Sequence, residues 1–180
     1  MIEQDDSILI QQCLEGNRKA YEAIVDKYQR PLYNVAYRFL QNAEDAEDVT
    51  QSVFIKAFEK LHSYKSNFKF FSWIYRIAVN ESINYKDARR PSAEIDEHLA
   101  SNERSPERIF LAGEIEQQIR KALIQLKTEY QIVIILKHFQ DCTYEEMSDI
   151  LEIPAKTVKS RLFSARQLLK EILIKQKSDD

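Results

Sequence analysis

The stretch IPAKTVKSRLFSARQ, residues 153–167, decides how this chain is interpreted. It holds four cations and one phenylalanine in a run whose apolar spacing is otherwise that of a helix. The whole chain is acidic, with a formal net charge of −3 and a pI of about 5.7. Positive charge is therefore concentrated in one late segment, and a solvated helix face is the simplest explanation for it.

Placed on a helical wheel, residues 157–173 separate into an apolar stripe, which must face a core, and a basic polar face. The preceding segment TYEEMSDILEI, residues 143–153, reads as a short amphipathic helix that Pro154 ends. Two short helices joined by a tight turn, the second one basic, favour a helix-turn-helix whose second helix enters the DNA major groove. In composition alone, a solvated helix explains the segment equally well. The apolar stripe consists of Val158, Leu162, Ala165, Leu169 and Ile172.

The composition of the chain predicts a helical protein. Of its 180 residues, 44% are hydrophobic and 31% are charged, a balance typical of a soluble, foldable chain. Only 2 glycines and 4 prolines occur, too few for a turn-rich β protein. The apolar pattern lapses in the polar, acidic stretch PSAEIDEHLASNER. We therefore predict an all-α fold of two small helical domains, residues 1–90 and 105–177, joined by a flexible acidic linker at residues 91–104.

Three helix starts are marked by capping residues. Asn17 is placed to cap a helix that begins at the next residue. Thr128 with Gln131, and Thr143 with Glu146, have the spacing of a capping box. These signals predict where three of the helices begin.

Charge is distributed unevenly along the chain. Residues 1–60 hold seven cations and eleven acids, a net charge of −4. Residues 61–90 hold six cations and two acids, a net charge of +4, and residues 154–177 hold seven cations and one acid, a net charge of +6. The acidic total thus hides one basic segment in each predicted domain, a pattern expected of a protein that binds a polyanion.

The basic segment of the first domain is also aromatic. LHSYKSNFKFFSWIYRIAVNESINYKDARR, residues 61–90, interleaves seven aromatic residues with its six cations. Helical phasing places Trp73, Arg76, Asn80 and Asn84 together, away from the expected core. Aromatic rings stack on unpaired bases and cations neutralise phosphates, so this combination favours single-stranded DNA. The side expected to face the core consists of Phe71, Ile74, Tyr75, Ala78 and Tyr85.

The segment AEDAEDVTQSVFIKAFEKL, residues 43–61, is apolar on two sides of a helix. Ile55 and Phe58 project from the second side, beside Asp48 and Gln51. Such a helix either lies at the centre of its own domain or presents a docking surface to another protein. Acids around two large apolar groups match an interface core with a polar rim. The first apolar side consists of Ala46, Val49, Val53 and Ala57, with Leu61 beside them.

Signals for catalysis, cofactors or export are not found in the sequence. Its two glycines lie outside any phosphate-binding loop and its three histidines have no metal-ligand spacing, so we expect neither an enzyme nor a cofactor. The N-terminus lacks the pattern of a signal peptide, and no apolar run is long enough to span a bilayer. Cys13 and Cys142 stand outside any CxxC spacing, so we expect a reduced, cytoplasmic protein without membrane insertion.

Three stretches together resemble bacterial RNA polymerase sigma factors of the sigma-70 family, specifically its extracytoplasmic-function (ECF) subfamily. They are AEDVTQSVFIKAFEKL at residues 46–61, FFSWIYRIAVNESINYKDARR at residues 70–90 and YEEMSDILEIPAKTVKSRLFSARQLLKEI at residues 144–172. The match runs in family order over nearly the whole chain. It implies two helical domains, sigma-2 and sigma-4, in a non-catalytic subunit that directs promoter-specific transcription initiation.

The resemblance also implies partners for each segment. In the family, the helix that matches residues 43–61 docks on the clamp coiled coil of the large subunit of core RNA polymerase, whose flap is a further contact. The segment that matches residues 61–90 melts the promoter −10 element and captures its unpaired bases. The recognition helix reads the −35 element as duplex DNA. Members of the family commonly also have an anti-sigma factor that occludes these surfaces.

Carried over residue by residue, the resemblance assigns three sets of side chains. The core-polymerase interface falls on Asp45, Asp48, Gln51, Ile55 and Phe58. The −10 surface falls on Tyr64, Lys65, Trp73, Arg76 and Asn80. The −35 surface falls on Thr157, Lys159, Ser160, Arg161, Phe163, Ser164 and Arg166. Many relatives carry Glu where this chain has Ser52, so one interface charge is missing here.

Two rival interpretations are kept. A stand-alone helix-turn-helix regulator would bind a twofold-symmetric operator as a dimer, tightly and without polymerase. That interpretation leaves the aromatic and basic segment at residues 61–90 unexplained. The second rival is a helical interaction protein or an enzyme of unrecognised type.

Overall fold

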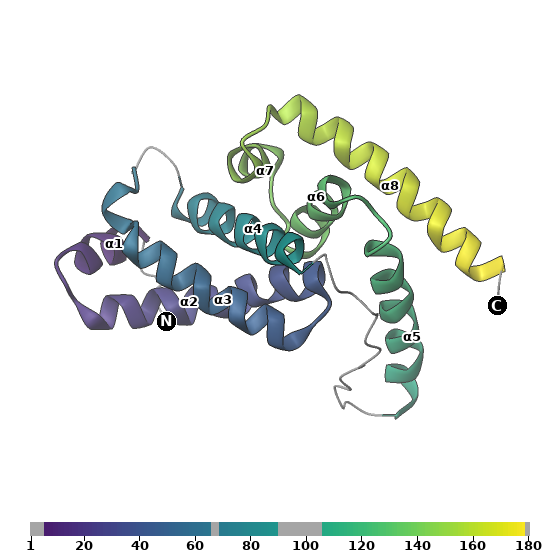
Figure 1. The fold of residues 1–180 in the computed structure, drawn as a ribbon, viewed down its shortest axis with the longest axis horizontal. Coiled ribbons are helices and arrows are strands. Elements are labelled where there is room, and N and C mark those ends of the chain that lie inside the picture. The colour runs from purple at the N-terminus through teal and green to yellow at the C-terminus, as the bar shows by residue number, and fades with distance from the viewer. Residues whose placement is uncertain (1–5, 66–68, 90–105, 179–180) are drawn as a thin grey trace.

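The computed structural model describes residues 6–65, 69–89 and 106–178. Within these ranges the chain is built from helices and the turns between them, without a strand (Figure 1). The all-α prediction is therefore confirmed. In chain order the helices are α1 (Asp6–Leu14), α2 (Arg18–Leu40), α3 (Ala43–Glu59), the short 3₁₀ helix η1 (Leu61–Ser63), α4 (Phe70–Ala88), α5 (Pro106–Leu123), α6 (Thr128–Phe139), α7 (Tyr144–Leu151) and α8 (Ala155–Ser178).

Helices α1 to α4 form the first unit around a shared core. The long α2 packs on α1, α3 and α4. Ile24 and Leu32 of α2 and Ile74 of α4 are fully removed from solvent, and each buried side chain of this size stabilises the fold by about 1.5–3 kcal/mol. The predicted apolar side of α3 is confirmed, because its members are at most 2% exposed: Ala46, Val49, Val53, Ala57 and Leu61.

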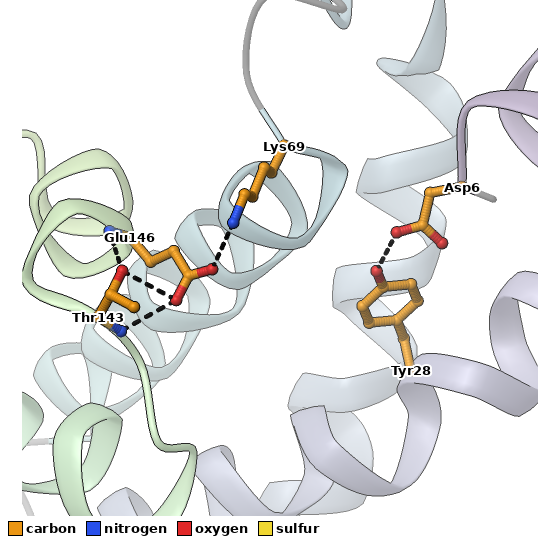
Figure 2. A network of polar contacts seen from close by, with 5 residues as sticks. All are labelled: Asp6, Tyr28, Lys69, Thr143 and Glu146. Atoms are coloured by element: carbon orange, nitrogen blue, oxygen red, sulfur yellow. Dashed lines mark hydrogen bonds and ion pairs between the residues drawn. The ribbon is translucent and has the colours of Figure 1, made fainter. Parts of the chain in front are cut away.

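A polar contact fastens α1 to α2. The Tyr28 hydroxyl donates a hydrogen bond to the Asp6 carboxylate over 2.6 Å (Figure 2). The Lys27 ammonium lies 2.9 Å from the other oxygen of Asp6. Burial and the adjacent carboxylate raise the pKa of Tyr28, so the phenol stays a donor. Asp6 is the first residue of α1, where a negative charge also suits the helix dipole.

Helices α5 to α8 form the second unit. The apolar side chains of α6 from Ile132 to Leu136 are at most 2% exposed. The predicted stripe of α8 is confirmed over its first half, where Val158, Leu162 and Ala165 are at most 1% exposed. Further along α8 the stripe is only partly buried, and Figure 1 shows this end of the helix projecting past α6 and α7.

The turn between α7 and α8 produces the predicted helix-turn-helix. Glu152 takes the left-handed conformation, with φ of 53°, and its N–H bonds to the Ser148 carbonyl oxygen. The Ser148 hydroxyl donates to the Ile153 carbonyl oxygen over 2.6 Å, which ties the turn to the end of α7. Pro154 follows and α8 begins at the next residue. The sequence prediction of a break at this proline is confirmed.

Two of the three capping predictions are confirmed. The Asn17 side chain accepts a hydrogen bond from the backbone two residues later. Thr143 and Glu146 form a complete capping box on α7. The predicted box at Thr128 is wrong, because that residue is already inside α6 and no side chain caps this helix. Gln131, the expected partner of Thr128, is fully buried instead.

The two units pack directly against each other. Helix α4 contacts α7 (Figure 1), and α2 contacts α6. One continuous set of buried side chains runs through both units. The predicted linker at residues 91–104 lies outside the described residues. The sequence indicated two helical units but did not predict the seam that joins them.

The described helices include none long and apolar enough to cross a membrane. Cys13 and Cys142 are each 1% exposed. Burial raises the pKa of both thiols, to about 12 for Cys142. Both residues therefore behave as small apolar side chains.

Candidate nucleic-acid and protein interfaces

The outer face of α3 combines one exposed apolar side chain with polar neighbours. Ile55 is 60% exposed, and the exposed Gln51 and Asp48 lie one and two turns before it. Phe58 is half-buried, because the Tyr21 ring of α2 packs edge-on against it with centroids 4.7 Å apart. An apolar centre with a polar rim is thus present at Ile55, whereas Phe58 also contributes to the packing of its own domain.

Asp45 corrects the sequence prediction for this surface. Its side chain is buried, at 8% exposure, and accepts hydrogen bonds from the Arg89 guanidinium and, over 2.9 Å, from the Tyr85 hydroxyl. Both donors belong to α4 or its C-terminal cap. A buried carboxylate that is paired in this way joins α3 to α4 and is not presented to a partner.

Ser52 has a partner within the domain. Its hydroxyl donates to the Glu81 carboxylate over 3.1 Å, and the Lys56 ammonium binds the same oxygen over 2.6 Å. A glutamate at position 52 would bring a second negative charge to Glu81. Serine at position 52 therefore leaves the ion pair between Lys56 of α3 and Glu81 of α4 without a competing charge.

The predicted −10 residues Tyr64 and Trp73 lie together. Their ring centroids are 5.4 Å apart, and Phe70 lies 5.5 Å from Trp73. We call these three rings the aromatic cluster. Tyr64 and Trp73 are half-buried, so each ring keeps an open side, and Lys65 next to them is exposed. Half-open rings beside a cation are suited to stacking on unpaired bases.

The rest of α4 follows the predicted phasing with two differences. Tyr75 and Ala78 are buried as expected, and Asn80 is exposed. Phe71 and Tyr85 are only half-buried, because Phe71 lies over the Tyr75 ring with centroids 4.2 Å apart and Tyr85 reaches out to α3. The core side of α4 is therefore narrower than the pattern of aromatic residues indicated.

Arg76, a third predicted −10 residue, is occupied by the second domain. Its Nη2 and Nε donate to the Asp149 carbonyl oxygen over 2.6 and 3.1 Å. Its Nη1 donates to the Glu152 carboxylate over 2.7 Å. All three contacts are at the C-terminal end of α7, where carbonyl oxygens have no intrahelical partner. In this arrangement Arg76 caps α7 and is only partly exposed, whereas the sequence pattern placed it on the side of α4 away from the core.

A second contact joins the other end of α7 to the start of α4. Figure 2 shows Lys69 pointing at Glu146, and the Lys69 ammonium lies 2.9 Å from the carboxylate. The other oxygen of Glu146 accepts the hydrogen bonds of the Thr143 capping box. Partial burial acts to raise the pKa of Glu146, but the bonds from Thr143 and Lys69 outweigh it and lower the pKa. Glu146 is therefore held ionised between two donors.

The exposed face of α8 carries the predicted duplex-reading residues. Phe163 is 66% exposed, and Lys159 and Ser160 are exposed one turn before it. Thr157 and Ser164 are half-buried, and the Ser160 hydroxyl donates to the Thr157 carbonyl oxygen over 2.9 Å. A phenylalanine at the centre of a basic, exposed helix face is available for apolar contact with a thymine methyl group.

Two cations of α8 are positioned by neighbouring helices. Arg161 lies 3.6 Å from the Glu129 carboxylate of α6 and is only partly exposed. The Lys159 ammonium lies 5.1 Å from the centroid of the Tyr144 ring, the first residue of α7. These two contacts limit the positions that the Lys159 and Arg161 side chains take on α8.

Arg166 is held by a histidine. Its Nε donates to Nε2 of His138 over 3.2 Å. Burial, and then the positive charges of Arg166 and Lys137, lower the pKa of His138, so the neutral ring is the acceptor at neutral pH. Sequence reasoning missed this residue, and also Glu129 and Tyr144. No local pattern identifies them, because each lies on a different helix from the cation that it positions.

Comparisons with known proteins agree with this geometry. Residues 24–91 match the family described as Sigma-70 region 2, and residues 116–169 match the family described as Sigma-70, region 4. The chain is 32% identical over 176 residues to the ECF RNA polymerase sigma factor SigW of Bacillus subtilis, with 91% of this chain and 94% of that protein covered.

Two solved structures share the fold. CnrH, determined in complex with the cytosolic domain of CnrY, superposes with a TM-score of 0.74 at 25% identity, over 93% of this chain and 96% of that one. The sigma factor RpoE from Bartonella quintana, determined with the anti-sigma factor NepR, gives a TM-score of 0.70 at 24% identity, over 86% of this chain and 97% of that one.

Both sigma regions are thus present, in order, in a chain that matches a relative over nearly its full length. The first part of the basic helix α8, to residue 169, lies in one matched region, and helices α3 and α4 lie in the other. The chain therefore belongs to the ECF subfamily of sigma-70 factors, the non-enzymatic subunits that bind core RNA polymerase and direct it to start transcription at promoters.

Proposed function

We propose that this chain performs its sigma role in the cytoplasm through three surfaces. Helix α3 docks on the clamp coiled coil of the large polymerase subunit, the aromatic cluster at the start of α4 captures −10 bases, and α8 reads the −35 duplex. The observation that best supports this proposal is that Trp73 and the 66% exposed Phe163 lie on different domains. One chain can therefore contact the −10 and the −35 elements at the same time.

The proposed docking surface of α3 consists of Asp48, Gln51, Ile55 and Phe58. Ile55 supports it most strongly, because a large apolar side chain that is 60% exposed gains by burial in an interface. The acid and the amide before it form a polar rim. Asp45 is left out of this proposal, because its carboxylate is buried against Arg89.

The proposed −10 surface centres on the aromatic cluster. Trp73 and Tyr64 supply stacking faces, Lys65 supplies a phosphate contact, and the exposed Asn80 supplies a base-edge donor and acceptor. Base stacking of this kind contributes about 1–3 kcal/mol per base, which offsets part of the cost of strand separation. Arg76 joins this surface only after it leaves α7.

The proposed −35 surface is the exposed side of α8. The side chains that face outward from the apolar stripe provide charge for phosphates, hydroxyl groups for phosphates or bases, and one apolar contact. Arg161 and Arg166 enter the groove from fixed positions, because Glu129 and His138 hold them. The set is Thr157, Lys159, Ser160, Arg161, Phe163, Ser164 and Arg166.

The two DNA surfaces act together once the polymerase holds the domains apart. Each contact raises the effective concentration of the other, so specificity for a promoter with both elements exceeds that of either domain alone. The fold shared with CnrH, which was determined with a bound protein partner, supports an anti-sigma factor as a further partner of this chain.

Run-off transcription tests this function. Purified core polymerase, with and without the chain, is given genomic fragments selected by the reconstituted holoenzyme. We expect discrete transcripts only when the chain is present. Tight binding of the free chain to a twofold-symmetric duplex, with no transcripts on addition of polymerase, would instead support the stand-alone regulator.

A further inference from the structure

His138 contacts a cation of the proposed −35 surface without belonging to α8. It is the second-to-last residue of α6, which packs on α8. Its Nε2 accepts a hydrogen bond from Nε of Arg166 over 3.2 Å. Because a neutral imidazole has one acceptor nitrogen, the ring carries its proton on Nδ1 in this arrangement. The contact therefore requires one protonation state and one tautomer of His138.

The bond to His138 uses the Nε donor of Arg166 and not its two terminal nitrogens. These terminal nitrogens form the edge of a guanidinium that donates two parallel hydrogen bonds to a guanine or a phosphate. His138 thus holds the Arg166 side chain from behind and leaves its recognition edge directed outward from the contact. The arrangement is suited to orienting Arg166 and does not compete with DNA for it.

Orientation matters because Arg166 is exposed. A long arginine side chain in solvent samples many rotamers, and a hydrogen bond at Nε reduces this freedom by fixing the plane of the guanidinium. Reading a base requires two hydrogen bonds in one plane, whereas attraction to a phosphate requires mainly charge. The contact with His138 therefore bears on discrimination between DNA sequences more than on overall affinity.

The surroundings of His138 are mostly positive. Partial burial and then the adjacent cations lower the pKa of His138 from 6.5, while Asp141 acts in the opposite direction. Ile119 of α5 lines the same groove and has no charge, and Arg38 of α2 lies over the neighbouring Phe139 ring. The charged groups that face His138 are Arg166 and Lys170 of α8, Lys137 of α6 and Asp141 after it.

A proton on Nε2 of His138 would reverse the contact. The imidazolium has two donors and no acceptor, so the hydrogen bond from Arg166 is lost. Two positive groups then lie side by side and repel each other, which moves the guanidinium away from its fixed position. The added charge attracts phosphates of any sequence. Protonation thus replaces one oriented donor with one more non-specific charge.

We propose that His138 is a positioning residue for −35 recognition: its neutral ring orients the Arg166 guanidinium toward the base edges, and its protonation lowers discrimination of the −35 sequence. This inference rests on the proposed role of α8 in reading the −35 duplex. It extends the specificity of α8 to a residue of α6 and makes that specificity depend on pH in the mildly acidic range.

Duplex binding by the reconstituted holoenzyme tests this role. One probe is a duplex that the wild-type holoenzyme enriches from a randomised pool at about pH 7.5, and the other is the same duplex with its −35 segment shuffled. The ratio of the two dissociation constants measures discrimination and cancels the general attraction of charge to phosphate. We expect the wild-type ratio to fall about five- to tenfold between about pH 7.5 and about pH 5.5.

A set of variants isolates the contact. His138→Gln offers an acceptor oxygen that does not titrate, so its ratio should stay nearly constant over this interval. His138→Ala removes the acceptor and should give a low ratio at both pH values. Arg166→Ala should also give a low ratio without this pH dependence, because His138 acts through Arg166. His62→Gln is the matched control, since it removes an exposed histidine of the first domain, and it should keep the wild-type profile.

Two outcomes of the binding experiment would overturn the inference. One is a parallel pH dependence of the ratio in the wild-type chain and His138→Gln. The other is a wild-type ratio in His138→Ala at about pH 7.5, because the side chain would then contribute nothing to discrimination.

Nuclear magnetic resonance of the free chain separates this inference from the proposed function. With isotope-labelled arginine, the Arg166 Nε resonance should shift with the midpoint of the His138 titration and should lose this shift in His138→Gln. An Nε resonance that does not follow His138 would overturn the positioning role. Failure of run-off transcription by the wild-type chain would reject the proposed function, while the resonance would still decide whether His138 controls Arg166.

Discussion

The Gln131 side chain of α6 donates a hydrogen bond from Nε2 to the carbonyl oxygen of Phe39 in α2, over 3.1 Å. Gln131 is fully buried, and its Oε1 accepts from the Lys86 ammonium of α4 over 3.1 Å. Phe39 lies in the last turn of α2, where carbonyl oxygens have no intrahelical partner. One side chain of the second domain thus completes the hydrogen bonding of a helix end in the first.

Gln131→Leu should destabilise the chain by about 1–3 kcal/mol, because the Phe39 carbonyl oxygen stays buried without its partner. Urea unfolding of the full chain, followed by circular dichroism, measures this change. Gln125→Leu is the control, because Gln125 is exposed and bonds only within its own region of the chain. Equal free energies of unfolding for the two variants would show that the interdomain bond adds nothing.

Ile55→Asp should weaken binding to core polymerase at least about tenfold, because it places a charge at the centre of the proposed α3 docking surface. Stability should change little, since Ile55 is 60% exposed. Fluorescence anisotropy with labelled chain and purified core enzyme measures the dissociation constant. The control Ile8→Asp alters an apolar side chain on α1 that is 50% exposed, and similar losses in both variants would exclude a specific role for Ile55.

Trp73→Ala should slow promoter opening more than it weakens binding of the holoenzyme to closed duplex, because the ring is proposed to stack on unpaired bases. Permanganate reactivity of thymines reports opening, and a gel-shift assay at low temperature reports duplex binding. Trp73→Phe keeps a ring against Tyr64 and Phe70 and should retain most of the opening. Normal permanganate reactivity in the alanine variant contradicts the stacking role.

Lys159→Ala should weaken binding of the holoenzyme to −35 duplex and reduce the salt slope of binding by about one, as expected for the loss of one phosphate contact. The salt dependence of the dissociation constant between about 50 and 200 mM salt measures this slope. Lys121→Ala, in the last turn of α5, is the matched control for net charge. An unchanged slope removes Lys159 from the DNA interface.

His138 should make the stability of the chain depend on pH. Its pKa in the folded chain is lowered from 6.5 by burial, then by Arg166 and Lys137, with Asp141 acting in the opposite direction. The unfolded chain therefore binds a proton first as pH falls, so the contribution of His138 is complete above 6.5 and declines as pH falls toward the folded pKa.

Thermal unfolding from pH about 7.5 to about 5 tests this dependence, since the ordinary histidine pKa lies in that interval. The wild-type chain should lose more melting temperature over the interval than His138→Gln, whose side-chain oxygen can still accept from Arg166 without titrating. Parallel curves for the two proteins would contradict the lowered pKa.

The features that the sequence predicted are those with a local cause. The stripe of α8 and the apolar side of α3 follow from the helical repeat, and the Thr143 cap follows from the fixed spacing of a capping box. The same reasoning failed at Thr128, because tertiary packing gave Gln131 a better partner in Phe39. It also misplaced Asp45, because no local pattern shows that Arg89 will reach back to α3.

The sequence by itself determined that this chain is helical, that each unit carries a basic segment, and that an aromatic and a basic helix are suited to single-stranded and duplex DNA. Only the tertiary structure decided which of those cations are free. Arg76 and Glu152 are 76 residues apart, and Lys69 and Glu146 are 77 residues apart. Such pairs arise because packed helices bring distant side chains within hydrogen-bond distance, and the periodicity of one helix carries no information about which helix will cover it.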